Sequence, residues 1–167
     1  MHKKALLVID VQKDVVNGAH NLDSVVSNIN ALISQARTSE VPVIWVQHSD
    51  DYLVLNSEGW EFVDDLKPAA GDLRIYKTEP SSFVGTPLQE ELMKLGIESL
   101  VITGAQSEYC VSATTQNAIE LGYKVSLVSD AHTTVDGDEG SALSIINARN
   151  ERFNKNLVEA GRVIFDE

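Results

Sequence analysis

Sulfur, basic charge and long apolar runs are scarce in this chain of 167 residues. Cys110 is the only cysteine, so no internal disulfide can form. There are 13 lysines and arginines and 25 aspartates and glutamates, which gives a formal net charge of -12. This charge argues against a protein that binds nucleic-acid phosphates. No stretch approaches the roughly 18 to 20 apolar residues of a membrane span, and the apolar run at residues 5–9 is too short for a signal peptide. We therefore expect a cytoplasmic protein that binds neither nucleic acid nor a membrane.

The composition is that of an ordinary globular domain, with 43% hydrophobic and 23% charged residues. A chain of this length buries roughly 70% of the surface that its unfolded form exposes, which supports a core without a disulfide or a structural metal. The sequence has no internal repeat and no linker. Residues 1–167 are therefore predicted to form a single domain.

Short apolar runs alternate with helical patterns along the whole chain. We predict six strands, at residues 5–9, 42–46, 73–76, 100–102, 125–128 and 163–165. Between them, apolar residues recur at helical spacing from Val25 to Ala36 and over residues 108–121. Most of the strands are continuously apolar, as strands covered on both faces are. The alternation predicts an α/β fold with three layers, α/β/α, in which helices cover a six-stranded, mostly parallel, Rossmann-like sheet.

Three residues with catalytic potential fall at the carboxyl ends of the predicted strands, where such sheets bind their ligands. Asp10 follows the first strand, Lys77 follows the third, and Cys110 lies near the start of the helix after the fourth. A thiol at a helix start is expected to have a pKa below its free value of about 8.5, because backbone N–H groups and the helix dipole stabilise the thiolate. Taken singly, a buried cysteine is more often inert, an aspartate often caps a turn, and a lysine is usually solvated. Their joint placement at one sheet edge favours nucleophilic catalysis.

At these residues the sequence resembles the isochorismatase-like cysteine hydrolases, the superfamily that includes nicotinamidases. The resemblance covers essentially the whole chain and rests on separate blocks in the right order. These blocks are residues 5–12 (ALLVIDVQ), Lys77 followed by residues 81–86 (SSFVGT), residues 101–111 (VITGAQSEYCV), and residues 118–123 (AIELGY) with residues 129–131 (SDA).

The resemblance implies a catalytic triad of Asp10, Lys77 and Cys110. It also implies a cis peptide between Ala105 and Gln106, and an oxyanion hole formed by the backbone N–H groups of Gln106 and Cys110. The implied strand order is 3-2-1-4-5-6, in which Lys77 lies two strands from Asp10 and must reach inward. The implied activity is that of a cysteine-dependent hydrolase that cleaves a C–N bond of a small amide through a thioester, in a homodimer or homotetramer.

The segment after the second strand departs from the pattern of nicotinamidases, which carry a metal-binding Asp-x-His cluster there and further histidines in the loop that follows. Here residues 47–51 read QHSDD, and the loop to Trp60 has no second histidine. One imidazole with acidic neighbours is a poor site for a divalent metal. The acidic run at residues 136–140 fails as a calcium loop, because its twelfth position is Asn147. We expect no metal and no cofactor, and a contribution of His48 or Asp50 to the pocket stays open.

Five side chains are candidates for the wall of a substrate pocket: Gln12, Gln47, Trp60, Phe83 and Tyr109. The two glutamines are expected as polar selectors, because side chains at strand ends face the crevice. Phe83 and Trp60 could equally be core residues. The irregular stretch from His48 to about Trp60 leaves the second strand at the same edge and is expected to form a wall or a lid.

Other functions remain open from the sequence. One is hydrolysis of a vinyl ether, as in isochorismate; this chemistry needs no sulfur nucleophile, and its dianionic substrate suits a chain of charge -12 poorly. A nicotinamidase and a catalytically silent binding protein are further alternatives. A phosphoacceptor signalling domain needs an acidic pair after the first strand and an aspartate after the third, where this chain has Val11 and Lys77. A dinucleotide-binding turn is disfavoured because residues 10–14 contain no glycine.

Overall fold

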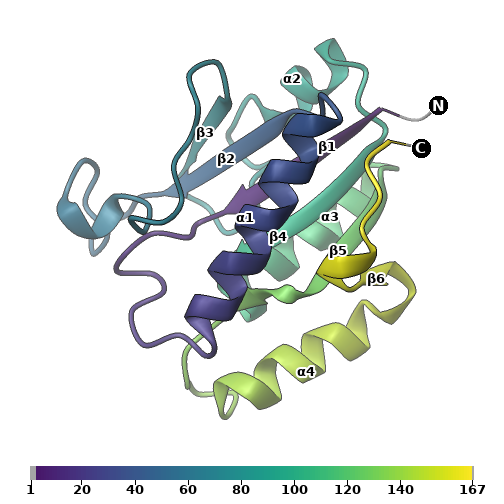
Figure 1. Ribbon diagram of the computed structural model, residues 1–167. Coiled ribbons are helices and arrows are strands. Elements are labelled where there is room, and N and C mark those ends of the chain that lie inside the picture. The colour runs from purple at the N-terminus through teal and green to yellow at the C-terminus, as the bar shows by residue number, and fades with distance from the viewer. Residues whose placement is uncertain (1–2, 167) are drawn as a thin grey trace.

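The computed structural model describes residues 3–166, which form a six-stranded sheet with helices on both faces (Figure 1). The strands are β1 (Lys4–Ile9), β2 (Val43–His48), β3 (Leu73–Lys77), β4 (Ser99–Ala105), β5 (Lys124–Thr133) and β6 (Leu157–Val158). The α-helices are α1 (Leu22–Thr38), α2 (Leu88–Lys94), α3 (Ser112–Glu120) and α4 (Ala142–Arg152). A π-helical turn, η2 (Ser107–Val111), leads directly into α3, and 3-10 turns lie at Glu58–Trp60, Asn154–Asn156 and Ala160–Arg162.

The strand order is β3-β2-β1-β4-β5-β6, and every neighbouring pair is parallel. This confirms the order that the resemblance implied. The central strand β1 is apolar throughout residues 5–9, and all of these residues are buried, because β1 is covered on both faces. Since all strands run the same way, their carboxyl ends gather at one edge of the sheet.

Two apolar cores flank the sheet and give the three layers. On one face α1 buries Val25, Ile29 and Leu32 against alternate residues of β1 and β4. On the other face α2 and α3 bury Leu88, Leu92 and Ala118. In Figure 1, α1 crosses in front of the sheet while α3 lies behind it.

The expectation of a strand at residues 163–165 is wrong. The sixth strand is Leu157–Val158, which pairs with β5, whereas Val163 and Phe165 are buried in the core on the α1 face. The carbonyl oxygen of Val163 accepts a hydrogen bond of 2.9 Å from the side chain of Gln35 in α1 instead of one from a neighbouring strand. The apolar run thus correctly indicated burial, but burial against a helix produces the same pattern as a short strand.

The helix predicted over residues 108–121 is divided into η2 and α3. Gly122, with φ of 91°, follows its end, as expected for a terminating glycine. Within the described residues no helix is both long and apolar enough to cross a membrane.

Candidate active site

Three strands, β1, β3 and β4, bring Asp10, Lys77 and Cys110 together at the carboxyl edge of the sheet, although β2 lies between β3 and β1. Asp10 follows β1 directly, with φ of 50°, and Lys77 is the last residue of β3. Cys110 lies in η2, which follows β4 after one residue. β4 approaches β1 closely because Gly104 has no side chain: a Cβ there would lie 2.0 Å from the carbonyl oxygen of Ile9.

The ammonium group of Lys77 lies at the centre of the cluster. Its Nζ is 2.8 Å from Oδ2 of Asp10 and 3.2 Å from Sγ of Cys110. It also lies 2.9 Å from Nδ1 of His48 and 3.0 Å from the carbonyl oxygen of Glu79. The Lys77 side chain is fully buried, so it does reach inward across β2 instead of extending into solvent.

The expected low pKa of the thiol is wrong. Burial, and next the negative charge of Asp10, raise the pKa of Cys110 to about 12, although the ammonium of Lys77 acts in the opposite direction. Burial also raises the pKa of the Asp10 carboxyl, against the influence of Lys77. The helix start alone predicts a thiolate, but desolvation outweighs that effect here. The resting side chain is therefore a thiol next to a carboxylate that pairs with Lys77.

His48 and Asp50 extend this cluster to the surface. His48 pairs in register with Lys77 across β2 and β3, which sets the imidazole beside the ammonium. Because an ammonium can only donate, Nδ1 of His48 must accept, and Nε2 then donates to Oδ2 of Asp50 at 3.0 Å. Oδ1 of Asp50 accepts backbone hydrogen bonds from Tyr52 and Leu53, which lower the pKa of Asp50. Asp50 therefore fixes the orientation of the imidazole that contacts Lys77.

The same cluster fits a metal ion poorly. Asp10, His48 and Cys110 each offer one ligand atom, and these atoms lie within 4.8 Å of one another. However, Nζ of Lys77 is within 3.2 Å of an atom of each of the three. The ammonium fills the position that a cation would need, and a metal could bind only by displacing it.

The turn η2, which carries Cys110, is held by buried polar contacts. The peptide between Ala105 and Gln106 is cis, at the position that the resemblance implied. In the next residue, Oγ of Ser107 lies 2.7 Å from Nδ1 of His132, whose Nε2 lies 2.7 Å from Oδ1 of Asn150. Burial lowers the pKa of His132, which favours the neutral imidazole. The contacts tie η2 to β5 and α4.

A cavity of about 400 Å³ opens above the thiol. This volume suits a small organic molecule. The lining residues are Asp10, Asp14, Val15, His48, Asp50, Tyr52, Leu53, Pro80, Gln106, Tyr109 and Cys110. Oδ1 of Asp10 is buried and has no hydrogen-bond partner among residues 3–166. A proton acceptor and a sulfur atom thus share a cavity that a ligand can enter.

Comparison with known proteins agrees with this geometry. A model of the isochorismatase domain matches residues 4–157. The chain belongs to the isochorismatase family. It is 37% identical over 136 residues to the isochorismatase family protein YrdC of Bacillus subtilis, covering 77% of this chain and 73% of that one. It is 34% identical over 139 residues to a streptothricin hydrolase of Streptomyces noursei, covering 80% of this chain and 50% of that one. Among solved structures, an isochorismatase from Pseudomonas putida matches with a TM-score of 0.88 and 30% identity, covering 96% of this chain and 90% of that one.

In this member of the isochorismatase family, four of the five residues expected to line the pocket do not line the cavity over the thiol, and only Tyr109 does. Gln12 is fully buried, and its side-chain amide forms hydrogen bonds with both ends of the 48–60 loop. It accepts one from the backbone N–H of His48 and donates to the carbonyl oxygens of His48 and Trp60. Gln47 is buried and also donates to the carbonyl oxygen of Trp60, at 3.3 Å. The side-chain amides that were expected to face the substrate therefore form hydrogen bonds with backbone groups of the loop.

Two of the three aromatic expectations fail because both rings pack against other rings. Trp60 is buried and stacks on Tyr76 at a centroid distance of 6.1 Å, and with Lys77 it lines a cavity separate from the one over the thiol. Phe83 stacks on Tyr123 at 6.0 Å and packs on the core beside α3.

The pocket residues that sequence reasoning missed lie in two loops. Tyr52 and Leu53 belong to the stretch that was expected to form a wall, so its position was correct although its residues were not identified. Asp14 and Val15 follow β1 in a loop that carried no motif. Their approach to the thiol depends on how that loop packs on Gly59, which the spacing of residues does not reveal.

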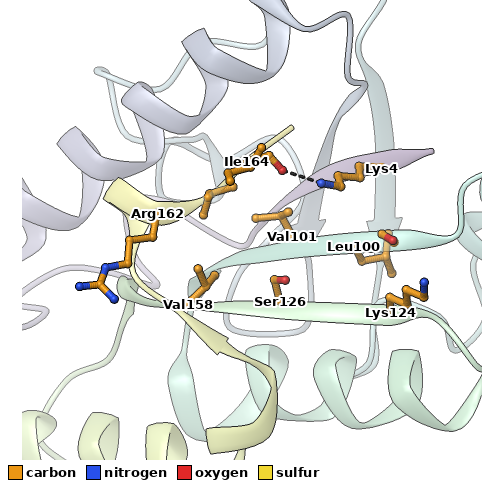
Figure 2. A pocket seen from close by; sticks show the side chains of 10 residues that line it. Lys4, Leu100, Val101, Lys124, Ser126, Val158, Arg162 and Ile164 are labelled. Atoms are coloured by element: carbon orange, nitrogen blue, oxygen red, sulfur yellow. Dashed lines mark hydrogen bonds between the residues drawn. The ribbon is translucent and has the colours of Figure 1, made fainter. Parts of the chain in front are cut away.

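A second cavity, of about 430 Å³, lies at the opposite edge of the sheet (Figure 2). Lys4, Lys124 and Arg162 are among its lining residues, and no carboxylate or thiol is among those described. Lys4 donates to the carbonyl oxygen of Ile164 at 2.6 Å, and Arg162 lies 3.6 Å from Glu159. This cavity lacks a nucleophile with a base, so the thiol cavity is the candidate active site.

Proposed function

We propose that this isochorismatase-family protein is a cysteine-dependent hydrolase that cleaves a C–N bond of a small amide through a thioester. The observation that carries the proposal is the contact of Lys77 with both Asp10 and Cys110 below a cavity of ligand size. Lys77 thus holds the base and the nucleophile side by side, with a carboxylate oxygen of Asp10 and Sγ of Cys110 within 4.8 Å of each other, as covalent catalysis requires. The printed names of two relatives, streptothricin hydrolase and ureidoacrylate amidohydrolase, favour hydrolysis of a C–N bond.

In the proposed first step the thiol proton moves to Oδ1 of Asp10 as Sγ of Cys110 attacks the carbonyl carbon. The C–N bond then breaks, and Asp10 returns the proton to the departing amine or ammonia. Water attacks the thioester, Asp10 accepts a proton from it, and the carboxylic acid leaves as the thiol is restored. A thiol pKa of about 12 means that the proton must leave during the attack, which makes Asp10 essential.

The backbone N–H groups of Gln106 and Cys110 are proposed to bind the oxyanion that forms at the carbonyl. Each such donor contributes about a hundredfold or more to the rate. Lys77 holds Asp10 and lowers the cost of charge on sulfur, and His48 with Asp50 orients Lys77. No step requires a metal ion.

Two other activities fit the cavity less well. Vinyl-ether hydrolysis of a dianion is disfavoured because no lysine or arginine is among the described residues that line the cavity. A nicotinamidase that holds its substrate through a metal would need further ligands beside His48, and the loop to Trp60 has no second histidine.

Replacement of Cys110 by Ala tests the proposal. We expect the variant to lose amide turnover by at least about a thousandfold, because no other sulfur is present to form the thioester. Release of ammonia or amine would be measured for nicotinamide, streptothricin, ureidoacrylate and simple alkyl amides, with an early burst expected from the wild type.

Circular dichroism and urea unfolding of the variant provide the control, since a folded inactive protein separates catalysis from stability. Full activity in folded Cys110→Ala would end the proposed mechanism. A wild-type protein that hydrolyses none of these amides would favour the binding-protein alternative.

A further inference from the structure

The walls of the thiol cavity carry negative charge without a matching positive group. Three carboxylates line it, from Asp10, Asp14 and Asp50, and the described lining residues include no lysine or arginine. The charge of Asp10 is offset by Lys77 at 2.8 Å. Asp50 accepts hydrogen bonds from His48 and from two backbone N–H groups. Of these three carboxylates, only that of Asp14 has no partner among the described residues.

Asp14 is exposed, and its backbone is fixed by the 48–60 loop while its carboxylate has no partner among the described residues. Its backbone N–H donates to the carbonyl oxygen of Gly59 at 3.0 Å. Its side chain occupies the space where a Cβ of residue 59 would stand, since that Cβ would lie 1.9 Å from Oδ2 of Asp14. No hydrogen bond or ion pair satisfies this carboxylate within residues 3–166. The neighbouring Lys13 turns away and pairs with Glu61 and Asp64 at 3.5 Å and 3.3 Å.

Aromatic faces flank the same cavity. Tyr52 is 97% exposed and Tyr109 is 55% exposed, and both line it. An exposed tyrosine ring attracts a cation through its π-electron face, by about 0.5 to 1 kcal/mol at a solvent-exposed site. Exposed rings beside an unpaired carboxylate form a surface suited to an organic cation.

The distribution of basic residues points the same way. The three cations Lys4, Lys124 and Arg162 gather around the cavity at the opposite edge of the sheet, as Figure 2 shows. At the carboxyl edge of the sheet, where the thiol cavity lies, the ammonium of Lys77 is buried among its partners. A ligand that approaches the thiol therefore meets carboxylates first.

We propose that the amide hydrolysed at this site carries a positive charge, an ammonium or a similar organic cation, and that Asp14 binds it. The inference rests on the proposed function, and it names the class of substrate. Asp14 is a specificity-determining residue under this proposal, because it contacts the charged end of the substrate and not the reacting atoms. An anionic amide of the same size would be repelled by the same group.

The test uses amides that differ only in charge at one end: 4-aminobutanamide, which carries an ammonium, and pentanamide, which has a methyl group in its place. The ratio of kcat/KM for the charged amide to that for the neutral amide would be measured for the wild type and for Asp14→Asn. Any intrinsic difference in reactivity between the two amides cancels when the ratios are compared. We expect the ratio to exceed one in the wild type and to fall about tenfold in Asp14→Asn.

The matched control is Asp51→Asn. Asp51 is exposed in the 48–60 loop, next to residues that line the cavity, but does not line it, and its substitution changes the net charge by the same amount. The ratio should be unchanged in this variant. An equal fall in both variants would mean that overall charge, and not Asp14, sets the preference, and it would overturn the assignment of Asp14.

Binding separates this inference from the proposed hydrolysis. Isothermal titration of both amides into Cys110→Ala, with and without Asp14→Asn, measures charge selection without turnover. Turnover of amides with no preference for the cation overturns the inference and leaves the hydrolase standing. Charge-selective binding that depends on Asp14, in a protein that hydrolyses no amide, overturns the hydrolase and keeps Asp14 as a cation-binding residue.

Discussion

At the residue scale, the proton of Cys110 is subject to opposing influences. Burial and the charge of Asp10 keep the proton on sulfur, while Lys77 at 3.2 Å favours its loss. The balance gives a thiol that is unreactive at rest, and in the proposed mechanism it becomes a nucleophile only when Asp10 takes its proton. Such an arrangement protects a cysteine that faces an open cavity from oxidation and alkylation.

Replacement of Asp10 by Asn should therefore have opposite effects on chemical reactivity and on catalysis. Loss of the negative charge leaves Lys77 beside the thiol, so the thiol pKa falls from about 12 and the thiolate fraction near neutral pH rises. Alkylation by iodoacetamide should become faster than in the wild type. Amide turnover should fall by about 10² to 10⁴, because the general base is gone.

The measurement is the alkylation rate of both proteins from about pH 7 to about pH 10, over which the wild-type rate should rise about tenfold per unit because its thiol pKa lies above this range. Asp51→Asn serves as the control for a change in net charge. Alkylation of Asp10→Asn that is no faster than that of the wild type would contradict this account of the thiol.

The meeting of Asp10, Lys77 and Cys110 at one edge of the sheet could be predicted from the sequence, but the state of the thiol could not. Asp10 and Lys77 come at the ends of recognisable strands, and Cys110 precedes a helical pattern. The pKa of Cys110 depends on how much water the surrounding side chains exclude, which only the packed structure reveals.

At the element scale, the close approach of β4 to β1 determines where Asp10 lies. Gly104 has φ of 126° at an irregularity in the β4–β5 register, and a Cβ there would lie 2.0 Å from O and 2.6 Å from N of Ile9. Both are backbone atoms of the residue that precedes Asp10, so they have little freedom to move away.

Gly104→Ala is therefore expected to lower the free energy of unfolding by about 1 to 3 kcal/mol, through a backbone clash and an unfavourable φ. It should also reduce kcat, because β1 and Asp10 must shift. Gly161→Ala is the control, since a Cβ at that position meets no atom within 4 Å and φ there is not positive. Urea unfolding and amide turnover would be compared, and equal stability of the two variants would contradict the prediction.

Five of the six predicted strands overlap the strands of the structure, and the one that fails is instructive. Residues 163–165 and 157–158 are both short and apolar, and the residues that pair with β5 cannot be chosen without knowing where α4 ends. The order of the other strands was implied by the family resemblance, and the alternation of strands with helical patterns predicted that they run parallel. A two-residue edge strand carries too little pattern to be recognised.

At the scale of the whole molecule, negative charge dominates the surface and also the entrance to the cavity. The net charge of -12 attracts cations to the protein, and the carboxylates of Asp14 and Asp50 extend that attraction to the thiol. Screening by salt shortens the range of such attraction from about 10 Å at 0.1 M to about 3 Å at 1 M.

Raising the salt concentration between these limits should lower kcat/KM several-fold for 4-aminobutanamide and leave that for pentanamide nearly unchanged. Steady-state kinetics on both amides in sodium chloride would give the two slopes. Parallel slopes would show that salt acts on the protein itself rather than on the attraction of the charged substrate.

The assembly of the protein stays a prediction. A homodimer or homotetramer was expected from the resemblance, and exposed apolar side chains such as Tyr52, Val54 and Leu55 lie in the wall of the site. Sequence patterns identify the buried faces of helices and strands, because burial repeats with the period of the element. They do not identify a surface formed by loops, where no period exists.

The hydrogen bonds of Gln12 have a consequence for how this pocket could change. One buried amide fastens both ends of the 48–60 loop, through His48 and Trp60. The side chains of residues 52–57 between these anchors could therefore be exchanged without moving His48 away from Lys77, as long as the backbone N–H groups of residues 52 and 53 still hold Asp50. Selection for a new substrate, in nature or in a library of variants, could redesign that short segment while the chemistry beneath it continued undisturbed.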